Sequence, residues 1–284
     1  MVCRAVASAL AQTRPPDEIV VVDDGSTDGA GDAVLRLDPR VRVVRTTGLG
    51  PAGARNAGAT AARAEWLALL DSDDVWLPHH LTAIADALET TPAPPPGVVF
   101  ADAVLPGGDD TVYRRADFAP GAPATRVEDA AGWALLRLQP MMPSATAIRR
   151  ADWLAVGGMD EQIECREDTD LYIRLALAGV PFVALAALGA RMERTTVSQM
   201  ASLKAPGTEA WWRATVSMYA GSLARGGGDD AARRELRRRA ATAEWRLSRL
   251  AWRSGRRSDA LRRLLASVGR DPAVVAGRVA RRPG

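Results

Sequence analysis

Short segments rich in apolar and β-branched residues recur along the first 200 residues, with more polar segments between them. Four of them lie at residues 19–22, 41–45, 66–70 and 98–104. A short apolar run without strict polar alternation is typical of a strand buried on both faces, as in a parallel sheet. Helical spacing between the runs then predicts an α/β fold with a mostly parallel, doubly wound sheet.

The pattern changes near residue 204. From residue 208 onward the chain has helical spacing throughout, and two helices joined at Ser254-Gly255 resemble one tetratricopeptide-type hairpin. We therefore expect two regions, an α/β domain at 1–203 and a small all-α region at 204–284.

The apolar run at 66–70 ends in the carboxylates of Asp71, Asp73 and Asp74. Clustered carboxylates repel one another, and desolvation increases the cost. Asp71 and Asp73 stand two positions apart just past a strand end, where they can bind one cation, and oxygen ligands suit Mg²⁺ or Mn²⁺. The alternative is a solvated acidic turn, in which Asp74 caps the helix predicted at 79–89.

The run at 19–22 also ends in acids, Asp23 and Asp24, followed by a Gly-Ser-Thr-Asp turn. Parallel sheets of the α/β class bind ligands at the carboxyl ends of their strands, so these acids are candidate ligand contacts. Ordinary turn chemistry explains them equally well.

Glycines precede a small-residue helix that carries Arg55. A glycine-rich helix start can bind phosphate, whose charge Arg55 could neutralise. The alternative is a helix that packs closely on the sheet through Ala and Gly.

Glu167 and Asp168 stand at the start of a helical stripe that ends near Gly179. The helix dipole favours acids there, which is a sufficient structural reason for them. A functional role needs a carboxylate that accepts a proton in a cleft. Spacing along the chain leaves both explanations open.

Composition and charge narrow the class of protein. No apolar run approaches the roughly 18 residues of a membrane span, and Cys3 and Cys165 alone predict no disulfide framework or zinc site, so we expect a cytoplasmic protein.

The charge is distributed unevenly along the chain. Residues 205–284 hold 18 arginines against 7 acids, a net charge of +11, which leaves −8 for the remainder of a chain of net charge +3. The basic region could contact an anionic membrane surface at the inner face, or simply present solvated helix faces. It has no recognisable nucleic-acid-binding motif, so no nucleic-acid partner is expected.

Several of these features stand in an order that resembles glycosyltransferase family 2, the inverting, metal-dependent transferases of the GT-A fold. The resemblance covers roughly residues 1–200 and rests on five short motifs. They are Asp23-Asp24-Gly25-Ser26-Thr27-Asp28, Gly53-Ala54-Arg55-Asn56-Ala57-Gly58, Leu70-Asp71-Ser72-Asp73-Asp74, Gly157-Gly158-Met159-Asp160-Glu161 and Glu167-Asp168.

The resemblance implies a donor site for a nucleotide sugar that is UDP-, GDP- or dTDP-linked. Asp24 would recognise the base with support from Asp23, and Arg55 would lie near the nucleotide. Asp71 would approach the ribose and the metal, and Asp73 would hold the Mg²⁺ or Mn²⁺ ion that bridges the diphosphate.

The resemblance also implies the acceptor side. Asp168 would be the general base, with Glu167 beside it, and would activate a hydroxyl of a glycan or lipid-linked acceptor. The expected function is sugar transfer with inversion, in polysaccharide or glycan synthesis.

Two departures from the family pattern stand out. Family members begin with a strand of the type Val-Ser-Val-Val-Ile-Pro-Thr-Tyr-Asn, ahead of the helix that we predict at residues 2–13. That strand is missing here, so we expect a gap in the middle of the sheet with unpaired backbone groups. Either the coding start lies upstream, or the chain is a non-catalytic relative that binds a nucleotide or a partner. A nucleotidyltransferase of related fold is a further alternative, although no Gly-rich basic loop indicates one.

The second departure is a His that family members often carry in a Tyr-Arg-x-His-like segment. The comparable stretch here holds Arg191 and Arg194, either of which could replace its charge.

Overall fold

The computed structural model describes residues 1–127, 132, 139–193 and 205–279. Its elements follow the chain in this order: α1 (Val2–Leu10), β1 (Ile19–Asp24), α2 (Ala30–Leu35), β2 (Val41–Thr46), α3 (Gly50–Ala61), β3 (Trp66–Ala68), β4 (Asp74–Trp76), α4 (His80–Thr90), β5 (Val98–Val104), α5 (Val112–Ala116), β6 (Ala124–Arg126), a 3₁₀ turn (Pro143–Ala145), β7 (Thr146–Arg149), α7 (Arg150–Ala155), α8 (Glu167–Leu177), β8 (Phe182–Met192), α10 (Glu209–Arg225), α11 (Asp230–Arg253), α12 (Arg257–Arg270) and α13 (Pro272–Val279).

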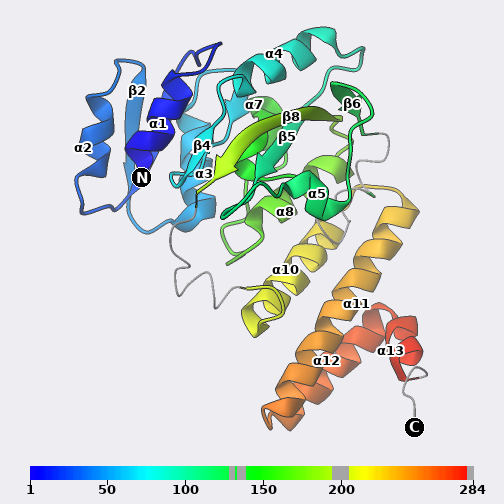
Figure 1. Ribbon diagram of the computed structural model, residues 1–284. Helices are drawn as coiled ribbons and strands as arrows, with labels where there is room; N and C mark the ends of the chain where they lie inside the picture. The colour runs from blue at the N-terminus through cyan, green and yellow to red at the C-terminus, as the bar shows by residue number, and fades with distance from the viewer. Residues whose placement is uncertain (128–131, 133–138, 194–204, 280–284) are drawn as a thin grey trace.

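The main sheet has the order β3-β7-β5-β8-β4, with β6 paired to β8. Its central pair, β5 and β8, is parallel, and the other pairings in this sheet are antiparallel. Every residue of β5 is buried, as its apolar run predicts. Helices cover the sheet (Figure 1), so the predicted α/β class is confirmed.

A second, two-stranded sheet stands apart from the first. It pairs β1 with β2 in parallel, Ile19 opposite Val41. A cavity of about 1600 Å³ lies between β1 and β3, and α1, α3 and α4 supply more of its lining. All six residues of β1 are only half-buried, although the strand is as apolar as β5 up to its acidic end. The gap expected in the middle of the sheet is therefore present.

The structure departs from the sequence analysis at two places. Residues 182–192 form the long central strand β8, which no prediction included. Asp74 does not cap a helix, because it is the first residue of the strand β4. Helix α4 begins at His80, and its N-cap residue is His79.

The C-terminal helices pack as an extension of the α/β part (Figure 1). Leu171 and Leu175 of α8 share one buried cluster with Met218 of α10 and Leu236 of α11. The hairpin predicted around Ser254-Gly255 is formed by α11 and α12. None of the helices in the described part of the chain is long and apolar enough to cross a membrane.

Candidate active site

Three carboxylates meet at the turn between β3 and β4. Oxygen atoms of Asp71, Asp73 and Asp74 all lie within 4.8 Å of one another. The hydroxyl of Ser144, which comes from a different part of the chain, accepts from the Asp71 backbone N–H at 3.1 Å. The same hydroxyl donates to Asp74 Oδ2 at 2.6 Å, so it fixes both ends of the turn.

Charge in this cluster is concentrated and partly desolvated. Asp74 is only 3 % exposed. Burial raises the pKa of Asp74, the hydrogen bond from Ser144 opposes the rise, and the charges of Asp71 and Asp73 add to it. A set of close carboxylate oxygens fits one hard divalent cation, which would relieve this repulsion. The cluster thus fits the Mg²⁺ or Mn²⁺ ion expected from the sequence, with Asp74 as a third candidate ligand.

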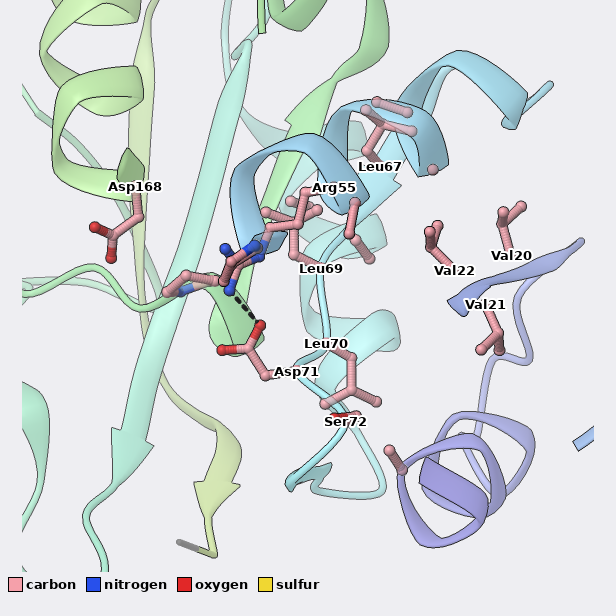
Figure 2. A pocket seen from close by; sticks show the side chains of 18 of the residues that line it. Val20, Val21, Val22, Arg55, Leu67, Leu69, Leu70, Asp71, Ser72 and Asp168 are labelled. Atoms are coloured by element: carbon pink, nitrogen blue, oxygen red, sulfur yellow. Dashed lines mark hydrogen bonds and ion pairs between the residues drawn. The ribbon is translucent and has the colours of Figure 1, made fainter. Parts of the chain in front are cut away.

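Arg55 connects this acidic cluster to α8. One guanidinium nitrogen donates to Asp71 Oδ1 at 2.7 Å, and another donates to Glu167 Oε1 at 3.0 Å. Burial alone would lower the pKa of Arg55, but the carboxylates of Asp71 and Glu167 raise it by more. The net pKa is therefore raised, and the guanidinium stays charged. Figure 2 shows Arg55 between Asp71 and Asp168, with the bond to Asp71 dashed.

Asp168 lies in the first turn of α8 and lines the same cavity as Asp71 and Asp73. Burial raises the pKa of Asp168, and the neighbouring Glu167 carboxylate raises it further. A hydrogen bond from the Thr169 N–H and the charge of Arg55 oppose this rise. A carboxyl group whose pKa is raised toward neutrality is well suited to general base catalysis.

The acids at the end of β1 have different surroundings. Asp23 accepts a hydrogen bond from the Ser26 N–H at 2.9 Å. Asp24 accepts from the N–H groups of Leu49 and Gly50 at the start of α3, at 2.9 and 2.8 Å. These backbone bonds are the main reason that the pKa values of both acids are lowered. Neither acid lines the cavity, whose β1 wall ends at Val22.

The structure therefore brings Arg55, Asp71, Asp73, Glu167 and Asp168 to one cavity, and leaves Asp23 and Asp24 at the neighbouring strand end. Sequence reasoning missed Ser144, because nothing in its local sequence marks it.

Sequence reasoning also missed the role of Asn56. The amide nitrogen of Asn56 donates to the Met159 carbonyl at 2.9 Å, and its oxygen accepts from the Met159 N–H at 2.8 Å. Asn56 thereby joins α3 to the Gly157-Gly158-Met159 turn. Arg191 lies in β8 opposite Val75, the residue that follows Asp74, whereas Arg194 is outside the described residues.

Comparison with known proteins assigns the chain to a family. The sequence profile described as Glycosyl transferase family 2 matches residues 1–152, more than half of the chain. The chain therefore belongs to glycosyltransferase family 2.

Individual relatives match shorter stretches. An uncharacterized glycosyltransferase of Nostoc sp. is 40% identical over 113 residues, which cover 38% of this chain and 34% of the relative. Succinoglycan biosynthesis protein ExoO of Rhizobium meliloti is 45% identical over 94 residues, covering 32% of this chain and 27% of the relative. The UDP-Glc:alpha-D-GlcNAc-diphosphoundecaprenol beta-1,3-glucosyltransferase WfaP of Escherichia coli is 37% identical over 87 residues, covering 30% of this chain and 35% of the relative. The matches thus span about a third of the length of these relatives.

Solved structures agree on the fold. S. aureus TarS 1-349 superimposes with a TM-score of 0.67 over 97% of this chain and 78% of that chain, at 17% identity. The same protein in complex with UDP-GlcNAc has a TM-score of 0.67 over 94% of this chain and 76% of that chain. The GT-A fold predicted from the motifs is confirmed.

Proposed function

We propose that the chain transfers a sugar from a nucleotide-diphosphate-sugar donor to an acceptor hydroxyl, with inversion and with the help of a divalent cation. The observation that carries this proposal is the position of Arg55, which holds Asp71 and Glu167 through one guanidinium group. That contact places an acidic cluster suited to a metal and a pair of helix-borne acids on one cavity.

The donor side is assigned to Asp71 and Asp73, with Asp74 as their buried neighbour. These residues would hold Mg²⁺ or Mn²⁺, which neutralises the charge that develops on the leaving diphosphate. Arg55 keeps the Asp71 carboxylate oriented toward this site. Asp24 and Asp23 would contact the base of the nucleotide from the end of β1.

The acceptor side is assigned to Asp168, with Glu167 beside it. The Asp168 carboxylate would take the proton of the acceptor hydroxyl as its oxygen attacks the anomeric carbon. A single base opposite the leaving group gives one displacement, and one displacement inverts the configuration. Glu167 accepts a hydrogen bond from Arg55, so its role is to orient the Arg55 guanidinium and not to accept the proton.

Relatives support the setting of the reaction. The name of WfaP specifies a UDP-linked donor and a diphosphoundecaprenol acceptor, that of ExoO succinoglycan biosynthesis, and TarS was solved with UDP-GlcNAc. We therefore place this chain in polysaccharide or glycan synthesis, with a UDP-linked donor as the first candidate ahead of GDP and dTDP. The acceptor would be a glycan or a lipid-linked sugar.

A lipid-linked acceptor suggests a peripheral location at the inner face of the membrane, in the cytoplasm. The side chains of Trp252, Leu261 and Leu265 are 59%, 58% and 62% exposed on the arginine-rich helical region. Cosedimentation with vesicles that contain phosphatidylserine, and none with neutral vesicles, is the expected result. Leu261→Ser with Leu265→Ser should abolish it, and equal binding to both kinds of vesicle would contradict a charge-dependent contact.

The decisive experiment is calorimetric titration of UDP, GDP and dTDP, with and without Mn²⁺, followed by transfer assays with the corresponding sugars. One nucleotide should bind in a metal-dependent manner. Asp168→Asn should retain that binding and lower kcat by about 10²- to 10⁴-fold. Full activity in Asp168→Asn would contradict the assignment of the base, and no binding of any nucleotide would contradict the donor site.

A second candidate function is nucleotide binding without catalysis. The separation of the β1–β2 sheet from the main sheet favours it, because the cavity between them borders the proposed donor site. Metal-dependent nucleotide binding with no transfer to any acceptor hydroxyl, water included, would distinguish this candidate from the enzyme.

A further inference from the structure

Arg166, the residue just before the two helix-borne acids, has an unusual backbone conformation. Its φ is 68°, and Asp117 is the only other non-glycine residue with positive φ in the described part of the chain. This left-handed region disfavours side chains that carry a Cβ. Arg166 is also the N-cap of α8, without a capping side-chain bond. Its conformation therefore fixes where the turn that carries Glu167 and Asp168 begins, and something else has to hold it.

The side chain of Arg166 is held by α10. Its guanidinium lies over the ring of Trp211, 4.6 Å from the ring centroid. The same group donates to the Thr215 hydroxyl at 2.9 Å. Trp211 and Thr215 are four residues apart, so they lie on one face of the helix. Thr215 is buried, and its own hydroxyl donates to the Trp211 carbonyl at 2.7 Å.

Further contacts keep α10 and the segment after it against α8. Arg225, the last residue of α10, donates to Asp160 Oδ2 at 2.5 Å and lies 3.9 Å from Asp170 Oδ1. Beyond α10, the N–H of Gly228 donates to the Leu177 carbonyl at the end of α8, at 3.0 Å. The C-terminal helical region thus contacts α8 near both of its ends.

We propose that Arg166 is a positioning residue for Asp168, and that Trp211 and Thr215 of α10 hold it in place. The proposal rests on the assignment of Asp168 as the general base. It gives the basic helical region a part in the reaction: α10 fixes the turn that presents the base to the acceptor side of the cavity. Trp211 and Arg166 also line that cavity, beside Asp168.

Charge provides a second consequence. Besides Thr169, the groups that act on the Asp168 carboxyl are Glu167, which raises its pKa, and Arg55 and Arg166, which lower it. Loss of the Arg166 charge should therefore shift the acidic limb of the kcat profile to higher pH. A purely structural role of Arg166 would lower activity at all pH values alike.

The test compares Trp211→Ala and Thr215→Val with the matched control Trp212→Ala. Trp212 is the adjacent tryptophan of α10 and packs on Val216 and Leu247, away from Arg166. The first two variants should lower kcat by about 10- to 100-fold and leave nucleotide affinity unchanged, because only the base is displaced. Trp212→Ala should keep the wild-type kcat. Equal kcat values in Trp211→Ala and Trp212→Ala would overturn the proposal.

Arg166→Gly and Arg166→Ala separate backbone from charge. Both variants lose the cation and its contacts with Trp211 and Thr215. Glycine adopts positive φ freely, so Arg166→Gly does so without backbone strain and should shift the pH profile with a moderate loss of kcat. Arg166→Ala keeps a Cβ at positive φ, which disfavours the turn, and should be the slower enzyme. A faster Arg166→Ala would show that the left-handed turn is not what positions Asp168.

Hydrogen exchange decides the proposal even if the chain proves to transfer no sugar. Amides of residues 163–170 should exchange faster in Trp211→Ala than in Trp212→Ala, relative to the rest of each protein. If transfer is absent but this difference is present, the proposed function fails and the positioning contact stands. If exchange in this segment is the same in both variants, the positioning contact itself is refuted.

Discussion

The ends of β1 and β3 carry the same pattern in sequence, an apolar run followed by acids, but the acids meet opposite electrostatic environments. At β1, backbone N–H groups of the following turns satisfy Asp23 and Asp24, and the pKa values of both are lowered. At β3, burial raises the pKa of Asp74, and Arg55 is shared between Asp71 and Glu167. Backbone N–H groups therefore stabilise the charged acids at the end of β1, whereas the acids after β3 retain negative charge that a bound cation can balance.

The sharpest test of this contrast is Asp73→Ala against Asp23→Ala. Removal of Asp73 takes away a metal ligand, so Mn²⁺-dependent nucleotide binding should be lost, with a fall of more than about 100-fold in kcat/KM. Asp23→Ala should bind nucleotide more weakly but retain the dependence on Mn²⁺. Calorimetry with and without Mn²⁺ measures both, and an unchanged metal dependence in Asp73→Ala would contradict the site.

Stability should show the next largest difference, between Arg55→Ala and Arg45→Ala. Arg55 is 20% exposed and pairs with two carboxylates, whereas Arg45 is 60% exposed and pairs with the exposed Asp32. Loss of Arg55 leaves unpaired, partly buried acids and should cost about 1–3 kcal/mol. Loss of Arg45 should cost less than about 1 kcal/mol. Urea unfolding compares the two, and similar losses would mean that the cluster is effectively solvated.

A smaller effect is expected for Asp24→Ala, which removes the carboxylate that accepts the N–H bonds at the start of α3. The folded-state pKa of Asp24 is lowered from 3.8, so its contribution is present above pH 3.8 and is lost as the pH falls through the folded value. Wild type should therefore melt at a higher temperature than Asp24→Ala at pH 7, and the difference should shrink in acid. A difference that persists at pH 2 would point to packing instead of charge.

Asp74→Asn should give the smallest effect, with the opposite sign. Because burial raises the folded-state pKa of Asp74 above 3.8, the folded state holds its proton more tightly, and stability falls as the pH rises between the unfolded and folded values. Without divalent cation, Asp74→Asn should raise the urea midpoint at pH 7 and leave it nearly unchanged at pH 3. A lower midpoint at pH 7 would show that the ionised carboxylate stabilises the turn.

Sequence reasoning succeeded where the signal is local. The apolar runs of β1 and β5 and the acids that follow β3 have a meaning within a few residues of chain, and the structure has them as predicted. The strand β8 was missed although Phe182–Leu185 is a continuous apolar run, because the alanine-rich segment after it has no strand signal of its own.

Long-range contacts account for the features that could not be predicted. Ser144 reaches Asp74 across 70 residues of sequence, and Thr215 reaches Arg166 across 49. Hydroxyl and guanidinium groups have many alternative partners, so neither residue type nor spacing identifies these pairs before the fold is known. The positive φ of Arg166 is equally silent in sequence, since positive φ is expected of glycine rather than arginine.

The cavity between β1 and β3 has a consequence for the behaviour of the protein in solution. Among the described residues, β1 pairs only with β2, and β3 is the last strand of its sheet, so each strand presents one open edge. Open edges of apolar strands are templates for pairing with strands of other molecules, and natural proteins usually cover or charge them. We therefore expect edge-to-edge aggregation in concentrated preparations of this chain, which light scattering over a dilution series would reveal.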